Sequence, residues 1–301
     1  MLSSLDPAAQ QFLTDLNRIA DRMALAQQRI TTGLKISQVS DAPESISLLL
    51  DARANLNATG QTLSNLGRVK AEVDAGEQAL EGAVGIFDKV QTLGAQGNTD
   101  TLTAAGRADV AQQLDSLLQQ TVGLAGTAVE GRFIFSGDTD QQAPYTYTAG
   151  QANPVSAYLG SGSTRLVQHP NGTAFSVSLT AQQIFDSADP TTNVFSAIQN
   201  LSAALKNNNS AAIHTAFDGL AKVGQYLNTQ LAFYGNTQNK VADATDFGKT
   251  LQVQLETQIS SFADADLTQA ILDLTQAQTQ QQAALESRAK LPRSTLFDYL
   301  G

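Results

Sequence analysis

The chain has 301 residues, 42% of them hydrophobic, which is enough to build a folded core and favours more than one domain. Acidic residues outnumber basic ones by 28 to 18, and the formal net charge of -10 would repel a phosphate backbone, so nucleic-acid binding is not expected. There is no cysteine, which excludes disulfides, thiolate metal sites and cysteine nucleophiles together.

The first predicted helix begins near Phe12 and carries apolar residues at alternating steps of four and three positions. These residues are Phe12, Leu16, Ile19, Met23, Ala26 and Ile30. Such a heptad stripe buries only one narrow face, so the helix needs a partner helix to be stable in water. We expect that partner at the far end of the chain, where similar spacing continues up to Pro292. The apolar residues there are Leu251, Leu255, Ile259, Phe262, Leu267, Ile271, Leu274 and Leu285.

A second, long helix is predicted from Asp41 to about Ala95. Asp41 and Glu44 have the spacing of a capping box, and Pro43 fits the first helical turn, where a missing N–H costs nothing. At 1.5 Å per residue a continuous helix would be on the order of 75 Å long. It contains Gly60, Gly67, Gly76, Gly82 and Gly85. Each glycine costs about 1 kcal/mol relative to alanine, so they predict sites of close helix approach, with a break as the alternative.

A third helix is predicted around 110–128, running back along the second after a turn at 97–100. The hydrophobic period changes at Gly131. From 136 to 192 the chain is rich in Gly, Ser, Thr, Tyr and Pro with alternating apolar patches, which is typical of a small β-rich insert. Helical spacing returns after the insert and continues to about Lys290.

These elements predict a mainly α fold: a long antiparallel helical bundle or coiled coil formed by the N- and C-terminal segments, with a small β-rich inserted domain. The terminal coiled coil is expected to take residues 1–42 and 255–301, the long-helix bundle residues 43–135 and 193–254, and the insert residues 136–192. Gln, Thr and Ala occupy many stripe positions of the last helices. We therefore expect these helices to be marginally stable alone and to be completed by neighbouring subunits.

Residues that could support chemistry are few and scattered. His169 and His214 are the only histidines, and neither is close in sequence to a cluster of carboxylates. Asp138 and Asp140 have an Asp-x-Asp spacing without the further ligands of a calcium loop, so a turn is expected. The segment 160–163 lacks the lysine of a phosphate-binding loop. No catalytic, metal-binding or cofactor-binding residue is predicted, and no enzyme activity.

The C-terminal third adds two local predictions. Asp264 or Asp266 is expected to cap the last helix, with Leu267 opening its apolar face. The Gln-rich stretch 276–282 is expected to form a polar helix face. No run approaches the roughly 18 apolar residues that a membrane span needs, and the N-terminus lacks the apolar block of a cleavable signal peptide. Membrane insertion is not expected, and export would have to use another route.

Segments near both ends resemble one known family. Residues 28–36 (QRITTGLKI) and the Asp-Ala-Pro at 41–43 resemble the N-terminal signature of bacterial flagellins and of their relatives at the hook–filament junction. Residues 262–267 (FADADL) resemble that family's entry to its last helix. Residues 131–137 (GRFIFSG) and 296–300 (LFDYL) are more similar to the hook-associated junction proteins than to filament flagellins.

The resemblance implies a structural protein of the bacterial flagellum with no active site, a hook-associated protein that joins hook to filament. A filament-forming flagellin is the alternative, and an unrelated helical enzyme or binding module is a distant third. The resemblance also implies self-association in a ring and contacts with a neighbouring hook-associated protein and with flagellin. It further implies that the chain is exported unfolded through the flagellar type III apparatus to the cell exterior. The paired termini would form the inner tubular layer, and the insert a small outer domain.

The resemblance also indicates, by position in the chain, which residues a chaperone would bind. In this family a cytoplasmic export chaperone holds the C-terminal helix, which falls on residues 267–300. The chaperone-binding residues expected on that basis are Leu285, Leu296, Phe297, Tyr299 and Leu300. The assembly seam is expected to comprise Phe12, Leu16, Ile19, Met23, Ile30, Leu255, Ile259, Phe262, Leu267, Ile271, Leu274 and Leu285.

Overall fold

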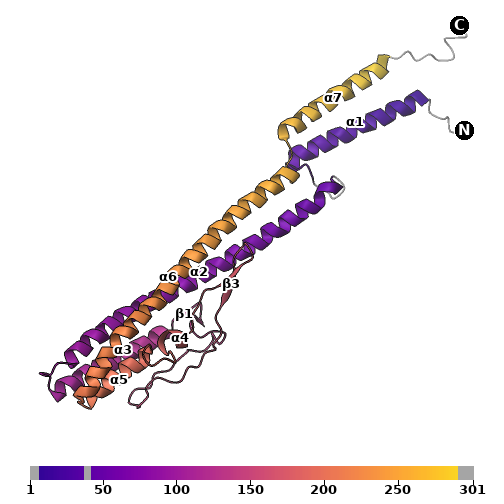
Figure 1. Cartoon of the computed structure of the whole chain (residues 1–301). Coiled ribbons are helices and arrows are strands. Elements are labelled where there is room, and N and C mark those ends of the chain that lie inside the picture. Colours follow the sequence, from indigo (N-terminus) through magenta and orange to yellow (C-terminus); the bar gives the residue numbers. More distant parts are fainter. Residues whose placement is uncertain (1–6, 37–41, 291–301) are drawn as a thin grey trace, which may run out of the picture. The chain divides into compact units, whose positions relative to one another are not determined.

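The computed structural model describes residues 7–36 and 42–290, and most of these residues are helical (Figure 1). The helices are α1 (Pro7–Thr32), α2 (Pro43–Gly97), α3 (Ala104–Ala125), α4 (Ala181–Phe185), α5 (Val194–Lys206), α6 (Ser210–Ala263) and α7 (Leu267–Lys290). Two antiparallel hairpins are formed by β1 (Ala128–Val129) with β2 (Arg132–Phe133), and by β3 (Leu166–Gln168) with β4 (Ala174–Ser176). The mainly α fold is confirmed, and the strands of the insert are short.

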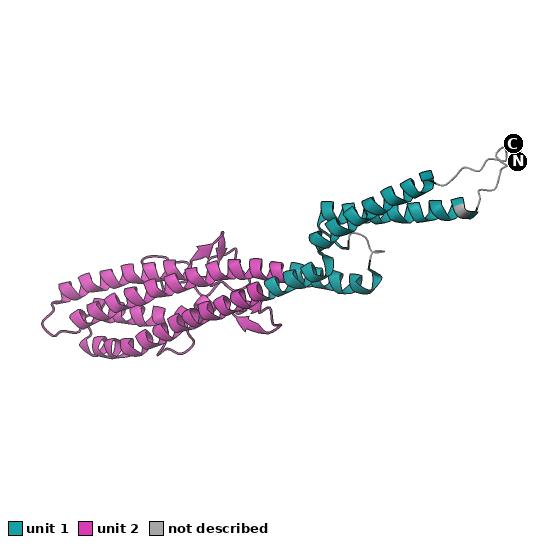
Figure 2. Cartoon of the chain, turned by 90° about the horizontal axis from the view of Figure 1, so that it is seen from above, with its two compact units in different colours: residues 1–58, 251–301 teal, residues 59–250 magenta. Residues whose placement is uncertain are grey.

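The chain divides into two compact units (Figure 2). Residues 1–58 and 251–301 form the first, which we call the terminal unit, and residues 59–250 form the second, the central unit. Helices α2 and α6 each contribute residues to both units. The finer division into three parts, with the insert separate, stays a prediction.

In the terminal unit, α1 and α7 pack side by side, which confirms that the two ends of the chain are partners. They run antiparallel, because Phe12 lies near Arg288 while Arg29 lies near Asp273. The amphipathic α1 turns its stripe inward, and Ala26 is buried at the centre of that stripe. Gly33 ends the helix with φ +69°, and its N–H donates to the Arg29 carbonyl at 2.8 Å. A residue with a side chain would be strained there.

The connection after α1 pairs with the turn between α6 and α7. The Lys35 N–H donates to the Ala263 carbonyl at 2.6 Å, and the Ala265 N–H donates to the Gly33 carbonyl at 2.8 Å. Ile36, Leu49 and Ala263 form a small buried cluster beside this pairing. Asp266 caps α7, accepting from the Gln269 N–H at 3.0 Å, as expected. These contacts tie the beginning and the end of the chain together at one corner of the terminal unit.

In the central unit, α2 and α6 run antiparallel and approach closely at glycines. A Cβ built on Gly76 would overlap the ring of Tyr234, and one on Gly248 would lie 2.7 Å from Leu63 Cδ2. Without side chains these glycines let the facing residues pack against the helix backbone. The prediction of close approach is confirmed for Gly76 and also for Gly82, which faces Leu124 of α3. It is wrong for the other three positions. Nothing lies within 4 Å of a Cβ at Gly60, Gly67 or Gly85.

The core of the central unit combines helices with the insert. Phe135 lies edge-on to Phe185 and to Tyr234, with ring centroids 6.3 and 6.1 Å apart. The ring centroid of Tyr145 lies 5.1 Å from that of Phe195, at the start of α5. Such edge-to-face pairs add to the burial of these large side chains. The insert therefore shares one hydrophobic core with α2, α3, α5 and α6.

Candidate functional site

The apolar residues of α7 are largely left outside the contact with α1. Among the described residues of α7, only Ala270 and Ala277 are buried. Leu267, Ile271 and Leu285 are 48%, 50% and 49% exposed. Because alanine buries far less apolar area than leucine, this helix gains little from its intramolecular contact.

The expected seam residues of α1 are half-buried. They are Phe12, Leu16, Ile19, Met23 and Ile30. The guanidinium carbon of Arg288 lies 5.6 Å from the centroid of the Phe12 ring, a cation–π contact at the far end of the pair. Leu13 and Leu25, outside the stripe, are exposed. The inward face of α1 is thus covered only in part by α7.

The remaining expected seam residues lie at several levels of burial. Leu255 of α6 is buried, and Ile259 and Phe262 are half-buried beside the Ile36 cluster. Leu274 of α7 is half-buried. Of the expected chaperone-binding residues, Leu285 is exposed on α7. The others, Leu296, Phe297, Tyr299 and Leu300, lie outside the described residues, as does the predicted cap residue Asp41.

Exposed large apolar side chains are concentrated in the terminal unit. They are Leu13, Leu25, Leu48, Leu50, Val253, Leu267, Ile271, Leu272 and Leu285. Their counterparts in the described part of the central unit are Leu159, Leu166 and Phe247. Because exposed apolar surface is typical of protein-association sites, the terminal unit is the candidate site of association.

Two clefts lie between α1 and α7 in the same unit. One of about 280 Å³ is lined by Arg22, Leu25 and Ala26 of α1 and by Gln276, Ala277 and Gln280 of α7. The other, of about 340 Å³, lies at the corner and is lined by Lys35, Ser261, Asp264, Ala265, Asp266, Gln269 and Ala270. Arg29 and Asp273 line both clefts. Sequence reasoning missed these clefts, because they depend on how closely two alanine-lined helices approach.

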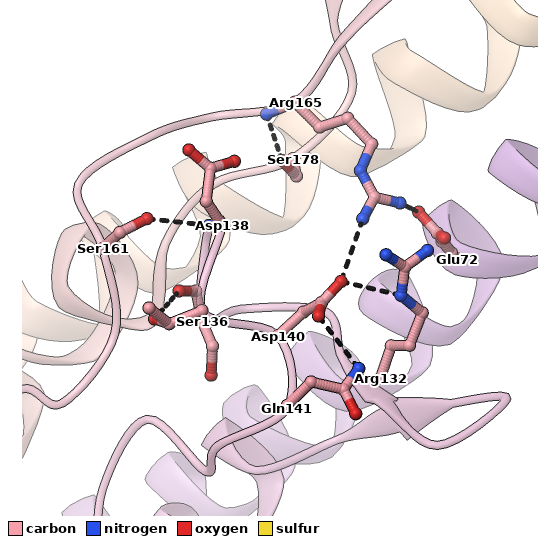
Figure 3. A network of polar contacts seen from close by, with 10 residues as sticks. Glu72, Arg132, Ser136, Asp138, Asp140, Gln141, Ser161, Arg165 and Ser178 are labelled. Carbon is pink, nitrogen blue, oxygen red and sulfur yellow. Dashed lines mark hydrogen bonds and ion pairs between the residues drawn. The ribbon is translucent and has the colours of Figure 1, made fainter.

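A network of charged side chains attaches the insert to α2 in the central unit (Figure 3). Asp140 Oδ2 accepts from Arg132 Nε at 2.7 Å and lies 3.8 Å from Arg165 Nη2. Arg165 Nη1 pairs with the Glu72 carboxylate of α2. The Asp138 N–H donates to Ser161 Oγ at 2.7 Å, in a turn. The Asp-x-Asp spacing is therefore part of a turn, as predicted, and Asp140 carries an ion-pair role that the sequence did not suggest.

The buried tyrosines also have structural partners. The Tyr145 hydroxyl donates to Asp186 Oδ2 at 3.2 Å, and the Tyr234 hydroxyl accepts from the Leu179 N–H at 3.2 Å. Burial raises the pKa of both hydroxyls above the ordinary value of 10.0, and for Tyr145 the negative charge of Asp186 raises its pKa further. Both side chains are therefore neutral across physiological pH.

The two histidines are far from any arrangement typical of catalysis. His169 Nδ1 accepts from the Asn171 N–H at 3.0 Å, and its ring centroid lies 5.3 Å from that of Phe247. His214 is exposed on α6. Within residues 7–36 and 42–290, no group of three His, Asp or Glu side chains is placed to hold a metal ion. None of the helices described is both long and apolar enough to cross a membrane.

Solved structures share this fold. A protein described as a flagellar hook-associated protein from Vibrio parahaemolyticus has a TM-score of 0.65 and 19% identity, covering 74% of this chain and 100% of that one. The flagellar hook-associated protein-3 of Legionella pneumophila has a TM-score of 0.62 and 12% identity, covering 72% and 98%. The FlgL protein of Bacillus cereus has a TM-score of 0.55 and 19% identity, covering 71% and 99%.

Comparison of sequences gives the family. A flagellin of Clostridium tyrobutyricum is 23% identical over 119 residues, which are 40% of this chain and 32% of that protein, so the match spans about a third of the relative. The model of the bacterial flagellin N-terminal helical region matches residues 4–140, and that of the flagellin C-terminal helical region matches residues 219–300. Because these two models together match most of its residues, the chain belongs to the bacterial flagellin family.

Proposed function

We propose that this protein is a structural subunit of the bacterial flagellum that joins the hook to the filament through association of its terminal helices. The fold shared with flagellar hook-associated proteins over nearly their whole length supports a junction role. The observation that carries the proposal is the exposed apolar surface of the terminal unit, above all on α7, where Leu267, Ile271 and Leu285 stay about half exposed.

Association would supply the burial that the terminal unit lacks. Each Å² of apolar surface removed from water stabilises by about 25 cal/mol, so covering several half-exposed leucines is worth a few kcal/mol per subunit. The residues proposed to lie in these contacts are the expected seam residues together with the other exposed apolar side chains of the terminal unit. Folding of the ends is then coupled to assembly, since a neighbour stabilises only the folded form.

The proposed partners follow from the flagellar role. Copies of this chain associate in a ring, with a neighbouring hook-associated protein on one side and flagellin on the other. The chain is exported unfolded through the type III apparatus to the cell exterior, and a cytoplasmic chaperone covers the C-terminal helix before export. Weakly buried terminal helices fit this route, because they are easily unfolded and leave apolar side chains available to a chaperone.

A filament-forming flagellin remains the second candidate, since the curated relative that matches over 119 residues is a flagellin. The two functions differ in the length of the assembly. A flagellin polymerises on its own into long filaments, whereas a junction subunit stops at a ring. Electron microscopy of the purified protein at high concentration, with and without hook seeds, distinguishes them.

The test replaces exposed apolar residues of α7 with a polar residue of similar size. Ile271→Gln and Leu285→Gln should leave the isolated protein as helical as the wild type, because both side chains are about half exposed there. Both should prevent incorporation into flagella and abolish swimming in a strain that lacks the chromosomal copy. Leu166→Gln, which changes a side chain 66% exposed in the central unit, is the matched control and should swim normally. Normal incorporation of both α7 variants would overturn the proposal.

A further inference from the structure

Arg29 in the terminal unit has a partly buried guanidinium group without a hydrogen-bond partner. It lies in the last turn of α1, where its Nε is buried and has no hydrogen-bond partner. Among the described residues its side chain forms no hydrogen bond and no ion pair. A guanidinium group has five N–H donors and is always charged, so leaving it partly buried without an acceptor costs free energy.

Arg107 is the useful comparison, because its Nε is likewise buried without a hydrogen-bond partner while its two terminal nitrogens are paired within the chain. This residue is buried in the central unit, and its Nη1 donates to Asn208 Oδ1 at 2.7 Å. Its Nη2 donates to the Thr99 carbonyl at 3.2 Å. Arg107 thus joins α3 to two loops through its terminal nitrogens, whereas the side chain of Arg29 forms no hydrogen bond or ion pair within the described residues.

The surroundings of Arg29 leave room for an acceptor. Arg29 lines both clefts between α1 and α7, with volumes of about 280 and 340 Å³. Arg22 lines the first cleft, which therefore has more cations than carboxylates, whereas Lys35 lines the second cleft together with Asp264 and Asp266. Asp273 also lines both, but it forms no ion pair with Arg29, and its Oδ1 accepts from Gln269 Nε2 at 2.8 Å.

We propose that Arg29 is an intermolecular docking site, which binds a carboxylate side chain of a second copy of this chain. This inference rests on the proposed self-association. It names one contact that would fix how neighbouring copies align. A carboxylate can accept two parallel N–H bonds from one guanidinium, which gives direction as well as attraction. Arg22 favours the same negative charge in the first cleft, whereas Asp264 and Asp266 offset Lys35 in the second.

A second copy is the occupant that the charges and the surface favour. Exposed leucines and isoleucines lie on α1 and α7, the same helices that form the clefts. The terminal unit also carries exposed carboxylates that form no ion pair among the described residues. They include Asp21, Glu44, Asp51 and Glu286. Each copy therefore offers both the cleft that holds the Arg29 donor and candidate carboxylate acceptors on one unit, as a head-to-tail ring contact requires.

A role within the chain is the competing explanation. A cation in the last turn of a helix stabilises the negative end of the helix dipole, typically by about 0.3–1 kcal/mol. In that case Arg29→Met would destabilise the isolated protein, and Arg29→Lys would restore it. If the role is intermolecular, Arg29→Met should not destabilise the isolated protein. Methionine removes a buried donor that has no acceptor there, and it keeps an apolar stem of similar length.

The first experiment measures thermal stability of the isolated full chain and its assembly onto hooks. Arg29→Met should melt no lower than the wild type and yet bind hooks at least about tenfold more weakly. Arg18→Met is the matched control, since Arg18 is an exposed residue of the same helix paired with Asp15 at 3.0 Å. It should assemble like the wild type. Wild-type assembly by Arg29→Met would overturn the inference, and so would a lowered melting temperature that Arg29→Lys restores.

The second experiment identifies the acceptor. Arg29→Lys places an amine at the site, and a carbodiimide couples amines only to adjacent carboxylates. In assemblies of mixed ¹⁴N and ¹⁵N chains, mass spectrometry should find the introduced amine joined to an Asp or Glu of a differently labelled copy, and Arg18→Lys should give no such product. A crosslink only within one chain, or only to another protein, would overturn the inference. If the wild type itself did not assemble while remaining folded, the proposed function would fail, and this inference with it.

Discussion

At the scale of single residues, a few charged side chains hold the insert on the helices. Asp140 accepts from Arg132 and lies beside Arg165, which in turn reaches Glu72 on α2. The Asp140 side chain is only 12% exposed, so water replaces its partners poorly. We therefore expect the network to stabilise the fold more than a surface ion pair, which contributes about 0–1 kcal/mol.

Asp140→Ala should lower the free energy of unfolding by about 1–3 kcal/mol, because two guanidinium groups lose a shared acceptor. Urea denaturation followed by circular dichroism measures this loss. Asp246→Ala is the control, since Asp246 forms an exposed pair with Lys249 at 3.5 Å and its side chain is 79% exposed. Its change should stay within about 0.5 kcal/mol. Equal losses in the two variants would show that the network adds nothing to stability.

The buried hydroxyls of Tyr145 and Tyr234 predict an alkaline limit for the central unit. Burial raises their pKa in the folded chain above the ordinary 10.0. The stability contributed by the neutral hydroxyls is therefore complete below pH 10 and is lost as the pH rises beyond it. Absorbance of tyrosinate and helical ellipticity, recorded together, should show these two side chains ionising only as the unit unfolds. Complete tyrosine ionisation with unchanged ellipticity would contradict the assignment.

At the scale of elements, the glycines of α2 show what a sequence can and cannot reveal. The helix is continuous from Pro43 to Gly97, as the apolar spacing predicts. Which glycines face a neighbouring helix depends on the rotation of α2 against α3 and α6. Gly76 faces Tyr234, while Gly85 faces open space, and the presence of glycine alone does not distinguish the two positions.

Gly76→Ala and Gly85→Ala should therefore shift stability in opposite directions. An alanine methyl at Gly76 meets the ring of a tyrosine only 2% exposed, and such overpacking costs about 1–3 kcal/mol. At Gly85 nothing lies within 4 Å, so the better helix propensity of alanine should stabilise by about 0.5–1 kcal/mol. Midpoints of thermal unfolding compare the two. A stabilised Gly76 variant would mean that α2 and α6 lie farther apart at this position than the structure shows.

The assignment of helix faces was also only partly predictable. The positions of the helix ends follow from local signals, such as the positive φ of Gly33 and the cap at Asp266. The inward face of α7 did not follow, because Leu267 and Ile271 suggest a leucine seam whereas Ala270 and Ala277 are buried. Arg29 lies inside a recognisable motif, but its lack of an acceptor depends on how α7 packs beside it. Spacing reveals which residues share a face, and the partner decides which face is covered.

At the scale of the whole molecule, the two units differ in how much of their apolar surface they bury. The central unit has a contiguous core that joins α2, α3, α5, α6 and the insert. The buried cluster of the terminal unit is small, comprising Ile36, Leu49 and Ala263. Under the proposed function, the central unit keeps its fold in the monomer, while the terminal unit gains its stability from neighbouring subunits.

Hydrogen exchange of the purified full chain, read by mass spectrometry, tests this claim most directly. Amides of α1 and α7 should exchange fast, because few buried contacts oppose their opening, and amides within residues 59–250 should be protected for much longer. After assembly onto hooks, α1 and α7 should become as protected as the central unit. Equal protection of both units in the isolated chain would contradict the account, because the terminal helices would then need no partner.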